Sequence, residues 1–413
     1  MKGHVFFVVM CWCFLAINPL FQAFGCEQIT QRREIHELSD LERQNLINAL
    51  KELKESGEYD RLTQVHVLAF KNVHGKPSFF PWHRKSLREF ELALQQIDPS
   101  LSLPYWDWTL DSQAPETSKV FEWFGGNGSS DDNCVGDFPL PSWETVSPNE
   151  SCLRRQFTLD GSKIPPFYPP EIIEEAISDS ESFEELRHVI EMGPHGSVHI
   201  GINGHMSQYN SPNDPLFWLH HAFIDKIWAD WQNRHGDLVE HYASDEHSIQ
   251  DTLPQFSTRV EEVLSVSSLC YEYVNTQSAS DSNNETPQTR MFLNRFSEQL
   301  KRIWKSTQAF PKDFIHPPDY SKIYGGPNAN DRTEVKLLRY PLGLPTEYVD
   351  MMGWNLTLVR KYESKFARII SEINRTSEYL SPAALVRRDI RQRMKNIWAK
   401  VRPWNNKPRS QNR

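Results

Sequence analysis

The chain has 413 residues, of which 38% are hydrophobic and 12% aromatic, enough for a sizeable core in one large domain or two ordinary ones. This composition excludes a chain that is disordered throughout, and the formal net charge of −9 argues against a nucleic-acid-binding protein.

The first 25 residues indicate secretion. Lys2 provides a positive start, an apolar run follows, and the small residues Ala23 and Gly25 precede a predicted cleavage point. The run is too short for a membrane span, and no later segment is long and apolar enough to cross a bilayer. We therefore expect a signal peptide over residues 1–25 and a mature protein that is secreted or held in a secretory vesicle.

Four cysteines remain after the predicted cleavage, and an even number in a secreted chain indicates two disulfides. Three pairings are possible. Cys134 and Cys152 flank one loop rich in Gly, Ser, Asp and Pro, so we favour that bridge, with Cys26–Cys270 as the other. Five glycosylation sequons suit the same compartment. They lie at Asn127, Asn149, Asn284, Asn355 and Asn374.

Apolar residues at helical spacing predict several helices in the first half of the chain. The first two cover 39–57 and 58–73, and the third, over 84–97, follows an aromatic, proline-rich stretch. The sequence LPYWDW at 103–108 predicts a rigid aromatic corner. Residues 111–165 are rich in Gly, Ser, Asp and Pro, so we expect a long surface excursion there.

The chain is expected to return to helix over 169–193, and the clearest helical pattern covers 214–235. Asp214 is a predicted cap of that helix, and Pro215 fits its first turn. A polar stretch at 273–290 has the composition of a linker.

That linker divides the mature chain into a domain at 26–272 and a C-terminal extension at 291–413. We expect the extension to be helical and to end in a basic tail. Its predicted helices cover 290–307, 363–374 and 382–401.

Histidines gather in two regions of the chain. One such residue usually satisfies a local hydrogen bond, but two groups of three need another explanation. The two groups are His66, His74 and His83 upstream, and His195, His199 and His221 downstream. Neutral imidazole suits copper, zinc, iron and nickel. A set without an anionic ligand favours a metal whose charge is balanced by bound oxygen, and copper fits that description.

Two carboxylate positions extend this hypothesis. Asp225 shares a helix face with His221, so we expect its carboxylate to hold the second ring nitrogen of that histidine. Arg84 and Asp107 are expected to form a buried pair that ties the third predicted helix to the aromatic corner.

Three stretches resemble the two copper-binding regions of the tyrosinase, catechol oxidase and molluscan haemocyanin superfamily. They are HGKPSFFPWHR at 74–84, LPYWDW, and PHGSVHIGINGHMSQYNSPNDPLFWLHHAFIDKIWADWQ at 194–232. The resemblance covers roughly residues 35–235 and is strongest to secreted invertebrate tyrosinases. It implies a mainly α fold, with a four-helix bundle around a dicopper centre.

By this resemblance the upstream histidines would bind one copper ion and the downstream histidines the other, with His220 set aside as a neighbour. The interval from His66 to His74 is shorter than in many relatives, but the alternative ligand, His36, lies too far upstream. Asn72 stands where some relatives have a cysteine, so their thioether cross-link to His74 is not expected.

The resemblance also implies roles for residues beside the metal. Phe217 would pack beside the imidazoles and exclude water, and Tyr209 would line the entrance. Glu191 matches a glutamate that, with an asparagine, orients a water for phenol deprotonation. Gly196 stands in place of that asparagine. We therefore expect stronger diphenolase than monophenolase activity.

The implied function is a type-3 copper oxidase that uses O2 to convert catechols, and monophenols such as tyrosine, to ortho-quinones. Its substrates would be small phenols or tyrosine residues of matrix proteins, and its products would form melanin or cross-links. The alternatives are a zinc-containing tautomerase of the same family and an oxygen-carrying haemocyanin-like protein. The stretch at 340–358 also resembles C-terminal segments of secreted invertebrate tyrosinases; whether it covers the metal pocket stays open.

Overall fold

The computed structural model describes residue 26 and residues 28–137, 143–236, 242, 247–274 and 337–375. The predicted signal peptide, most of the predicted linker, the predicted helices over 290–307 and 382–401 and the basic tail lie outside the described residues. The described part is mainly α, as predicted, and none of its helices is long and apolar enough to cross a membrane.

The first two long helices follow the sequence pattern closely. Helix α1 (Asp40–Glu55) begins with a capping box, in which Ser39 Oγ accepts from Glu42 N and Glu42 Oε2 accepts from Ser39 N. Gly57, at a φ of 79°, joins it to α2 (Glu58–Val73), which has the predicted bounds.

Helix α3 (Phe79–Ile97) begins five residues before its predicted start, because its first turn takes in the aromatic stretch. Pro81 lies in that turn, where the backbone N–H groups have no partner within the helix and a missing one costs nothing. Helix α8 (Leu216–His235) is buried around most of its circumference, and α3 and α5 pack against it. Asp214 Oδ1 accepts from Leu216 N at 2.9 Å, as expected of a capping side chain, although the N-cap position itself is Pro215 and the helix begins one residue later than predicted.

The single helix expected over 169–193 is in fact two helices and a turn. Helix α5 (Pro170–Asp179) ends before Ser182, whose side chain caps α6 (Phe183–Ile190) by accepting from Glu185 N. A π-helical turn (Glu191–His195) that contains Pro194 then leads into α7 (Gly196–Ile202). Local sequence explains why the helix is interrupted. The side chain of Ser182 bonds to the backbone of a new helix, and Pro194 has no backbone N–H to donate.

Short elements complete the described domain. Strand β1 (Thr30–Arg32) pairs in parallel with β4 (Tyr271–Tyr273), and β2 (Glu144–Thr145) pairs antiparallel with β3 (Ser151–Cys152). Within the predicted excursion lies the one-turn helix α4 (Val120–Trp123). Single 3₁₀ turns occupy Ile35–Glu37, Pro115–Thr117, Gly204–Ser207, Ser211–Asn213, Val260–Val263 and Ser267–Leu269.

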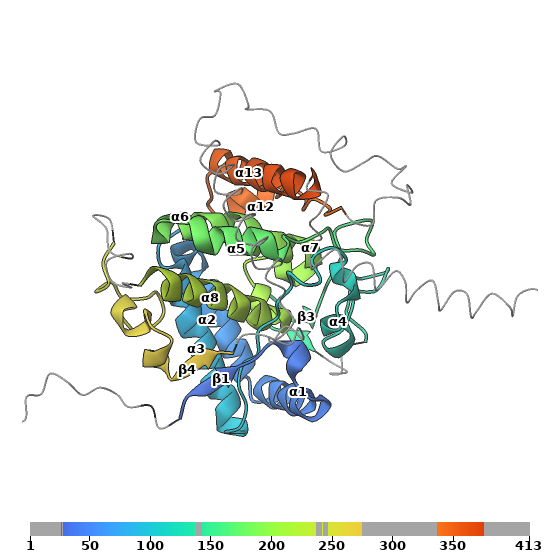
Figure 1. The fold of residues 1–413 in the computed structure, drawn as a ribbon. Coiled ribbons are helices and arrows are strands. Elements are labelled where there is room, and N and C mark those ends of the chain that lie inside the picture. Colours follow the sequence, from blue (N-terminus) through green and yellow to red (C-terminus); the bar gives the residue numbers. More distant parts are fainter. Residues whose placement is uncertain are drawn as a thin grey trace, which may run out of the picture.

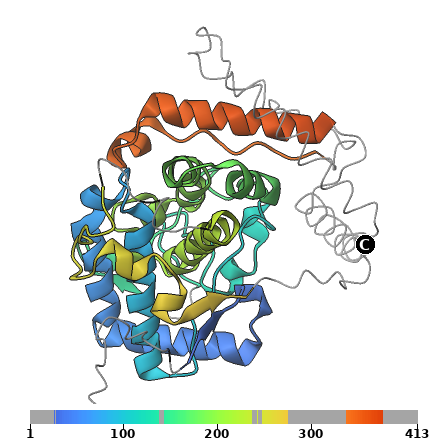
Figure 2. The ribbon, with the colours of Figure 1, turned by 60° about the vertical axis from the view of Figure 1, so that its left-hand side comes forward.

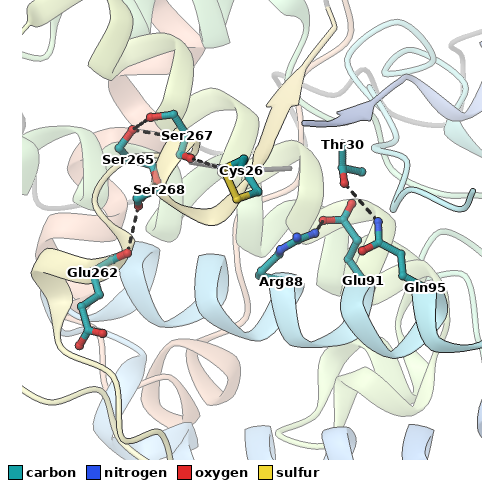
Figure 3. Close-up of a disulfide and its surroundings, with 10 residues drawn as sticks. Cys26, Thr30, Arg88, Glu91, Gln95, Glu262, Ser265, Ser267 and Ser268 are labelled. Atoms are coloured by element: carbon teal, nitrogen blue, oxygen red, sulfur yellow. Dashed lines mark hydrogen bonds and ion pairs between the residues drawn. A yellow bond between two sulfur atoms is a disulfide. The ribbon is translucent and has the colours of Figure 1, made fainter. Parts of the chain in front are cut away.

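Both favoured disulfides are present, Cys26–Cys270 and Cys134–Cys152. The first ties the start of the described chain to the residue before β4. Figure 3 shows its surroundings, where Gln95 Nε2 donates to Thr30 Oγ1 and Arg88 pairs with Glu91 on α3. The N-terminal strand is therefore fixed both to β4 and to α3.

The C-terminal part of the described chain packs back on this domain. Helices α12 (Thr346–Met351) and α13 (Leu356–Arg375) follow an extended stretch that begins at residue 337. Figures 1 and 2 show α13 lying across α5 and α6, and it contacts the turn Glu191–His195. The predicted helix over 363–374 lies within α13.

Candidate metal centre

Five elements bring the six predicted histidines together in the protein interior. Helix α2 carries His66 and ends at His74, α3 carries His83, the π-helical turn and α7 carry His195 and His199, and α8 carries His221. Each of the six is at most 5% exposed. These elements thus meet around the histidines, as the predicted bundle requires.

The histidines form two groups whose ring nitrogens lie close enough to share an ion. In one group the nitrogens of His66, His74 and His83 lie within 4.8 Å of one another, and in the other those of His195, His199, His220 and His221 do. The rings of His83 and His221 stack at a centroid distance of 4.2 Å, which places the two groups side by side.

Backbone carbonyls fix the orientation of five of these rings through Nδ1. Three contact the carbonyl four residues earlier: His74 with Phe70 at 3.1 Å, His83 with Phe79 at 2.8 Å and His195 with Glu191 at 3.1 Å. His66 contacts Tyr209 O at 3.1 Å, and His199 contacts Met206 O at 2.5 Å. A ring that donates its Nδ1–H in this way presents the lone pair of Nε2 to a metal.

Several of the remaining nitrogens are buried without a hydrogen-bond partner in the described part of the protein. They include Nε2 of His66, His83 and His195. The Nε2 atoms of His199 and His221 face each other at 3.3 Å. Unpaired buried nitrogens are costly, so this convergence calls for an ion that accepts their lone pairs.

Burial keeps the imidazoles neutral. It lowers the pKa of His66, His74, His83, His195 and His221 well below the usual value, and the neighbouring imidazoles lower these pKa values further. Burial also lowers the pKa of His199 to about 4. A buried set of neutral nitrogen donors without thiolate or carboxylate ligands fits copper.

The structure also brings His220 into the downstream group, although the sequence analysis set it aside. Its ring stacks on His195 with centroids 5.5 Å apart, and its Nδ1 accepts from Trp108 Nε1 at 3.1 Å. The alternative ligand His36 lies elsewhere, with its Nδ1 3.0 Å from Glu34 and its ring against Trp123. The geometry therefore favours His66 over His36 for the upstream group.

Phe217 lies where the sequence placed it. Its ring centroid is 4.1 Å from that of His221 and 5.1 Å from that of His66, and the side chain is 1% exposed. The ring therefore packs against a histidine of each group. Tyr209 contacts the upstream group through its carbonyl, while its ring packs 6.4 Å from that of Phe70.

The prediction that Asp225 forms a hydrogen bond with His221 is wrong. The Asp225 carboxylate accepts from Arg84 Nε at 2.6 Å and from the hydroxyls of Tyr271 and Tyr273 at 2.5 and 2.7 Å. His221 Nδ1 has no partner among the described residues. These three donors, one guanidinium and two hydroxyls, come from other elements and occupy the carboxylate in place of His221. Asp225 therefore connects β4 and α3 to α8.

The prediction of a buried ion pair between Arg84 and Asp107 is also wrong, because Arg84 has stronger partners elsewhere. Arg84 is bound by Asp225, Gln232 Oε1 and the Leu264 carbonyl. Asp107 instead accepts from Thr109, and burial raises the pKa of Asp107 to about 6.

Glu191 is fully buried and held by three donors from three parts of the chain. Its Oε1 accepts from Gly75 N at 2.7 Å and from Trp354 Nε1 at 3.2 Å, and its Oε2 accepts from Arg187 Nη1 at 2.9 Å. Burial raises the pKa of Glu191, and these donors act in the opposite direction. Sequence reasoning identified Glu191 but missed Trp354, because 163 residues separate the two.

Comparison with known proteins gives matches over the same region. A profile described as the common central domain of tyrosinase matches residues 56–234. The chain is 35% identical over 230 residues to a tyrosinase of Streptomyces antibioticus, covering 50% of this chain and 84% of that relative. It is 32% identical over 257 residues to a grixazone synthase of Streptomyces griseus, covering 49% and 83%.

Solved structures give weaker likenesses. A functional unit of octopus hemocyanin aligns with a TM-score of 0.48 at 19% identity, covering 64% of this chain and 72% of that one. A polyphenol oxidase from Thermothelomyces thermophila aligns with a TM-score of 0.46 at 21% identity, covering 60% and 89%. The assignment of the chain therefore depends on the sequence matches.

Proposed function

The chain belongs to the tyrosinase family of type-3 copper oxidoreductases, and from this we propose that it is a secreted oxidase of catechols. The observation that carries the proposal is the convergence of buried imidazole nitrogens, among which Nε2 of His66, His83 and His195 have no partner in the described part of the chain. A pair of copper ions held there supplies the redox chemistry by which O2 oxidises a phenol or catechol to an ortho-quinone. Two catechols give their electrons and hydroxyl protons to one O2, which leaves as water.

We assign one copper ion to the upstream histidines and the other to the downstream histidines. The upstream ligands are His66, His74 and His83, and the downstream ligands are His195, His199 and His221. We prefer His221 to His220 because the His221 ring also stacks on His83, at the junction of the groups. His220 already uses Nδ1 to accept from Trp108, and its ring supports His195.

The remaining side chains orient these ligands or act on the substrate. Phe217 packs on His66 and His221 and excludes water from one side of the centre. Glu191 lies between the ends of the two groups, bound to Gly75 on one side and preceding His195 on the other. A carboxylate has about four acceptor positions. The described donors use three, so we propose that the fourth, on Oε2, holds a water that takes the substrate's hydroxyl proton.

The expected preference for diphenols has a structural basis. A Cβ atom at Gly196 would lie 3.0 Å from Leu344 Cδ1 and 3.3 Å from the Trp354 ring, so a side chain there would have to displace them, and glycine itself offers no polar group to help Glu191 hold a water. Oxidation of a monophenol depends more strongly on prior deprotonation of the hydroxyl group than oxidation of a catechol does. We expect purified, copper-loaded protein to oxidise L-DOPA faster than L-tyrosine, with a lag on L-tyrosine. Equal rates without a lag would contradict this assignment.

Secretion and an extracellular role are part of the same proposal. The two disulfides suit an oxidising compartment, and the sequon residues Asn149 and Asn355 are exposed. We propose that the quinones cross-link matrix proteins through their tyrosines or polymerise to melanin. Expression in a secreting eukaryotic cell tests the compartment, since the protein should appear in the medium with its N-terminus at Cys26. Retention of the intact chain in the cell would refute secretion.

We propose that residues 26–272 form the catalytic domain and that 273–290 link it to the extension at 291–413. Support comes from the Cys26–Cys270 disulfide and the pairing of β1 with β4, which join the two ends of the domain. The extension is not independent of that domain, because α13 contacts the turn that carries His195.

A further inference from the structure

The C-terminal segment 337–375 meets the catalytic domain at the metal centre itself. Leu344, Tyr348, Val349, Met352, Trp354 and Val359 form one buried cluster with Phe70 and Met192. Phe70 lies on α2 beside His74, with ring centroids 4.4 Å apart, and Met192 lies in the turn that leads to His195. The segment therefore covers the ends of both histidine groups.

Glycines in the catalytic domain allow this close approach. A Cβ atom at Gly75 would lie 3.3 Å from Trp354 Cδ1, and one at Gly196 would lie 3.3 Å from the same ring. One at Gly193 would lie 2.9 Å from Phe366 of α13. Each distance is tighter than ordinary van der Waals contact, so the segment fits this surface only because side chains are absent there.

Trp354 also makes a polar contact at this interface. Its Nε1–H donates to Glu191 Oε1 at 3.2 Å, next to the Gly75 N–H at 2.7 Å on the same oxygen. The indole is 6% exposed, and its ring lies 6.2 Å from that of His195. Trp354 thus occupies the space beside Gly196 and supplies Glu191 with a donor that residue 196 cannot provide.

We propose that Trp354 is a positioning residue of the active site, which fixes the Glu191 carboxylate between the two histidine groups. The segment 337–375 would then be a part of the active site that is required for full activity, and not a segment that has to be displaced before the site can act. Three donors from three parts of the chain hold the carboxylate in one orientation, and the loss of the Trp354 donor leaves only Gly75 and Arg187 to restrict its terminal torsion. The inference rests on the proposed function only where Glu191 is given a role in turnover.

The test uses the full-length protein and four variants. Trp354→Phe keeps an aromatic ring and removes the N–H, Glu191→Gln removes the charge, and the double variant closes a cycle. Trp231→Phe is the matched control. Trp231 is also buried and donates to a backbone carbonyl, Ser180 O at 2.9 Å, away from Glu191.

The first measurement is amide hydrogen exchange at Gly75, which needs no activity. We expect Gly75 to exchange about tenfold faster in Trp354→Phe, because a mobile carboxylate protects this amide less. Trp231→Phe should leave the rate unchanged. An unchanged Gly75 rate in Trp354→Phe would overturn the proposal, whether or not the protein oxidises catechols.

The second measurement is catechol turnover by copper-loaded protein. We expect Trp354→Phe to lower kcat about tenfold with little change in KM, since misplaced catalytic groups act on the chemical step. In the Glu191→Gln background the same change should have almost no further effect. If the losses of kcat in the two single variants are additive, the indole acts by packing and not through Glu191. A higher kcat/KM in Trp354→Phe would show that the indole obstructs the site. Failure of the unmodified protein to turn over would count against the proposed function alone.

Discussion

At the scale of single residues, the main question is which of the neighbouring histidines His220 and His221 is the third ligand of the downstream metal ion. Both are fully buried and lie in the downstream group. His221 faces His199 through Nε2 and stacks on His83, whereas His220 is bound to Trp108. Because Nδ1 of His220 accepts from Trp108, a neutral His220 ring carries its proton on Nε2, which supports His221 as the proposed ligand.

We predict different metal contents for the two alanine variants. His221→Ala should retain about one copper ion per chain and lose turnover, because the downstream site would keep only two of its assigned ligands. His220→Ala should retain both ions. Elemental analysis after copper loading measures this, with near-ultraviolet circular dichroism to verify folding. Loss of an ion from His220→Ala, with both retained by His221→Ala, would reverse the assignment.

Asp225 has a structural role at the same scale. It accepts from Arg84 and two tyrosines, and Arg32 lies 3.6 Å away, so its removal leaves buried cationic and hydroxyl groups without their acceptor. We predict that Asp225→Ala costs about 3–5 kcal/mol of folding free energy. Chemical denaturation of the metal-free protein measures it.

Asp230 provides the control for that change. It lies on the same helix and pairs with Lys226, but its side chain is 33% exposed. Asp230→Ala should cost less than about 1 kcal/mol. Comparable losses from the two variants would show that the Asp225 cluster contributes little.

At the scale of elements, the capping box of α1 gives a prediction with a defined pH dependence. The Ser39 backbone and hydroxyl donate to Glu42 and lower the pKa of Glu42 from 4.5 to about 2. A lowered pKa in the folded state means that the unfolded state binds the proton more readily. The stabilisation is therefore complete above pH 4.5 and is lost as the pH falls toward 2.

Ser39→Ala should lower the free energy of unfolding by about 1 kcal/mol at neutral pH. The difference from the unmodified protein should stay constant down to about pH 5 and shrink below it. Denaturation curves at several pH values measure this. A difference that grows as the pH falls would contradict the capping role of Glu42.

The elements differ in how well the sequence predicts them. Helix α2 has its predicted bounds because its apolar spacing and its glycine start are local signals. The stretch 169–193 was predicted as one helix, since local propensity does not show that Ser182 caps a new helix or that Pro194 sits in a π-helical turn. Short irregular turns depend on tertiary packing, which periodicity does not report.

The candidate site was predictable to the same extent. The histidines were found because their residue type and spacing are specific. The partners of Asp225 and Glu191 were not, because Tyr271, Tyr273 and Trp354 come from distant parts of the chain. Buried carboxylates pair with the strongest hydrogen-bond donors that the fold brings near them, and those donors need not be close in sequence.

At the scale of the whole molecule, the central claim is that two copper ions and a catechol meet inside one bundle. All six histidines are buried, and a ring nitrogen of His66, His83, His195 and His221 has no partner among the described residues. Metal binding at such a site is therefore coupled to the folded structure. The zinc-containing and oxygen-carrying alternatives would use the same residues, so metal identity and turnover must be measured together.

The most direct test measures metal content and L-DOPA oxidation on one purified, full-length sample. We predict two copper ions per chain and quinone formation that consumes O2, with both lost on chelation and both regained on copper addition. A protein that holds only zinc and leaves L-DOPA unchanged, or one that holds two copper ions and binds O2 without oxidising L-DOPA, would contradict it.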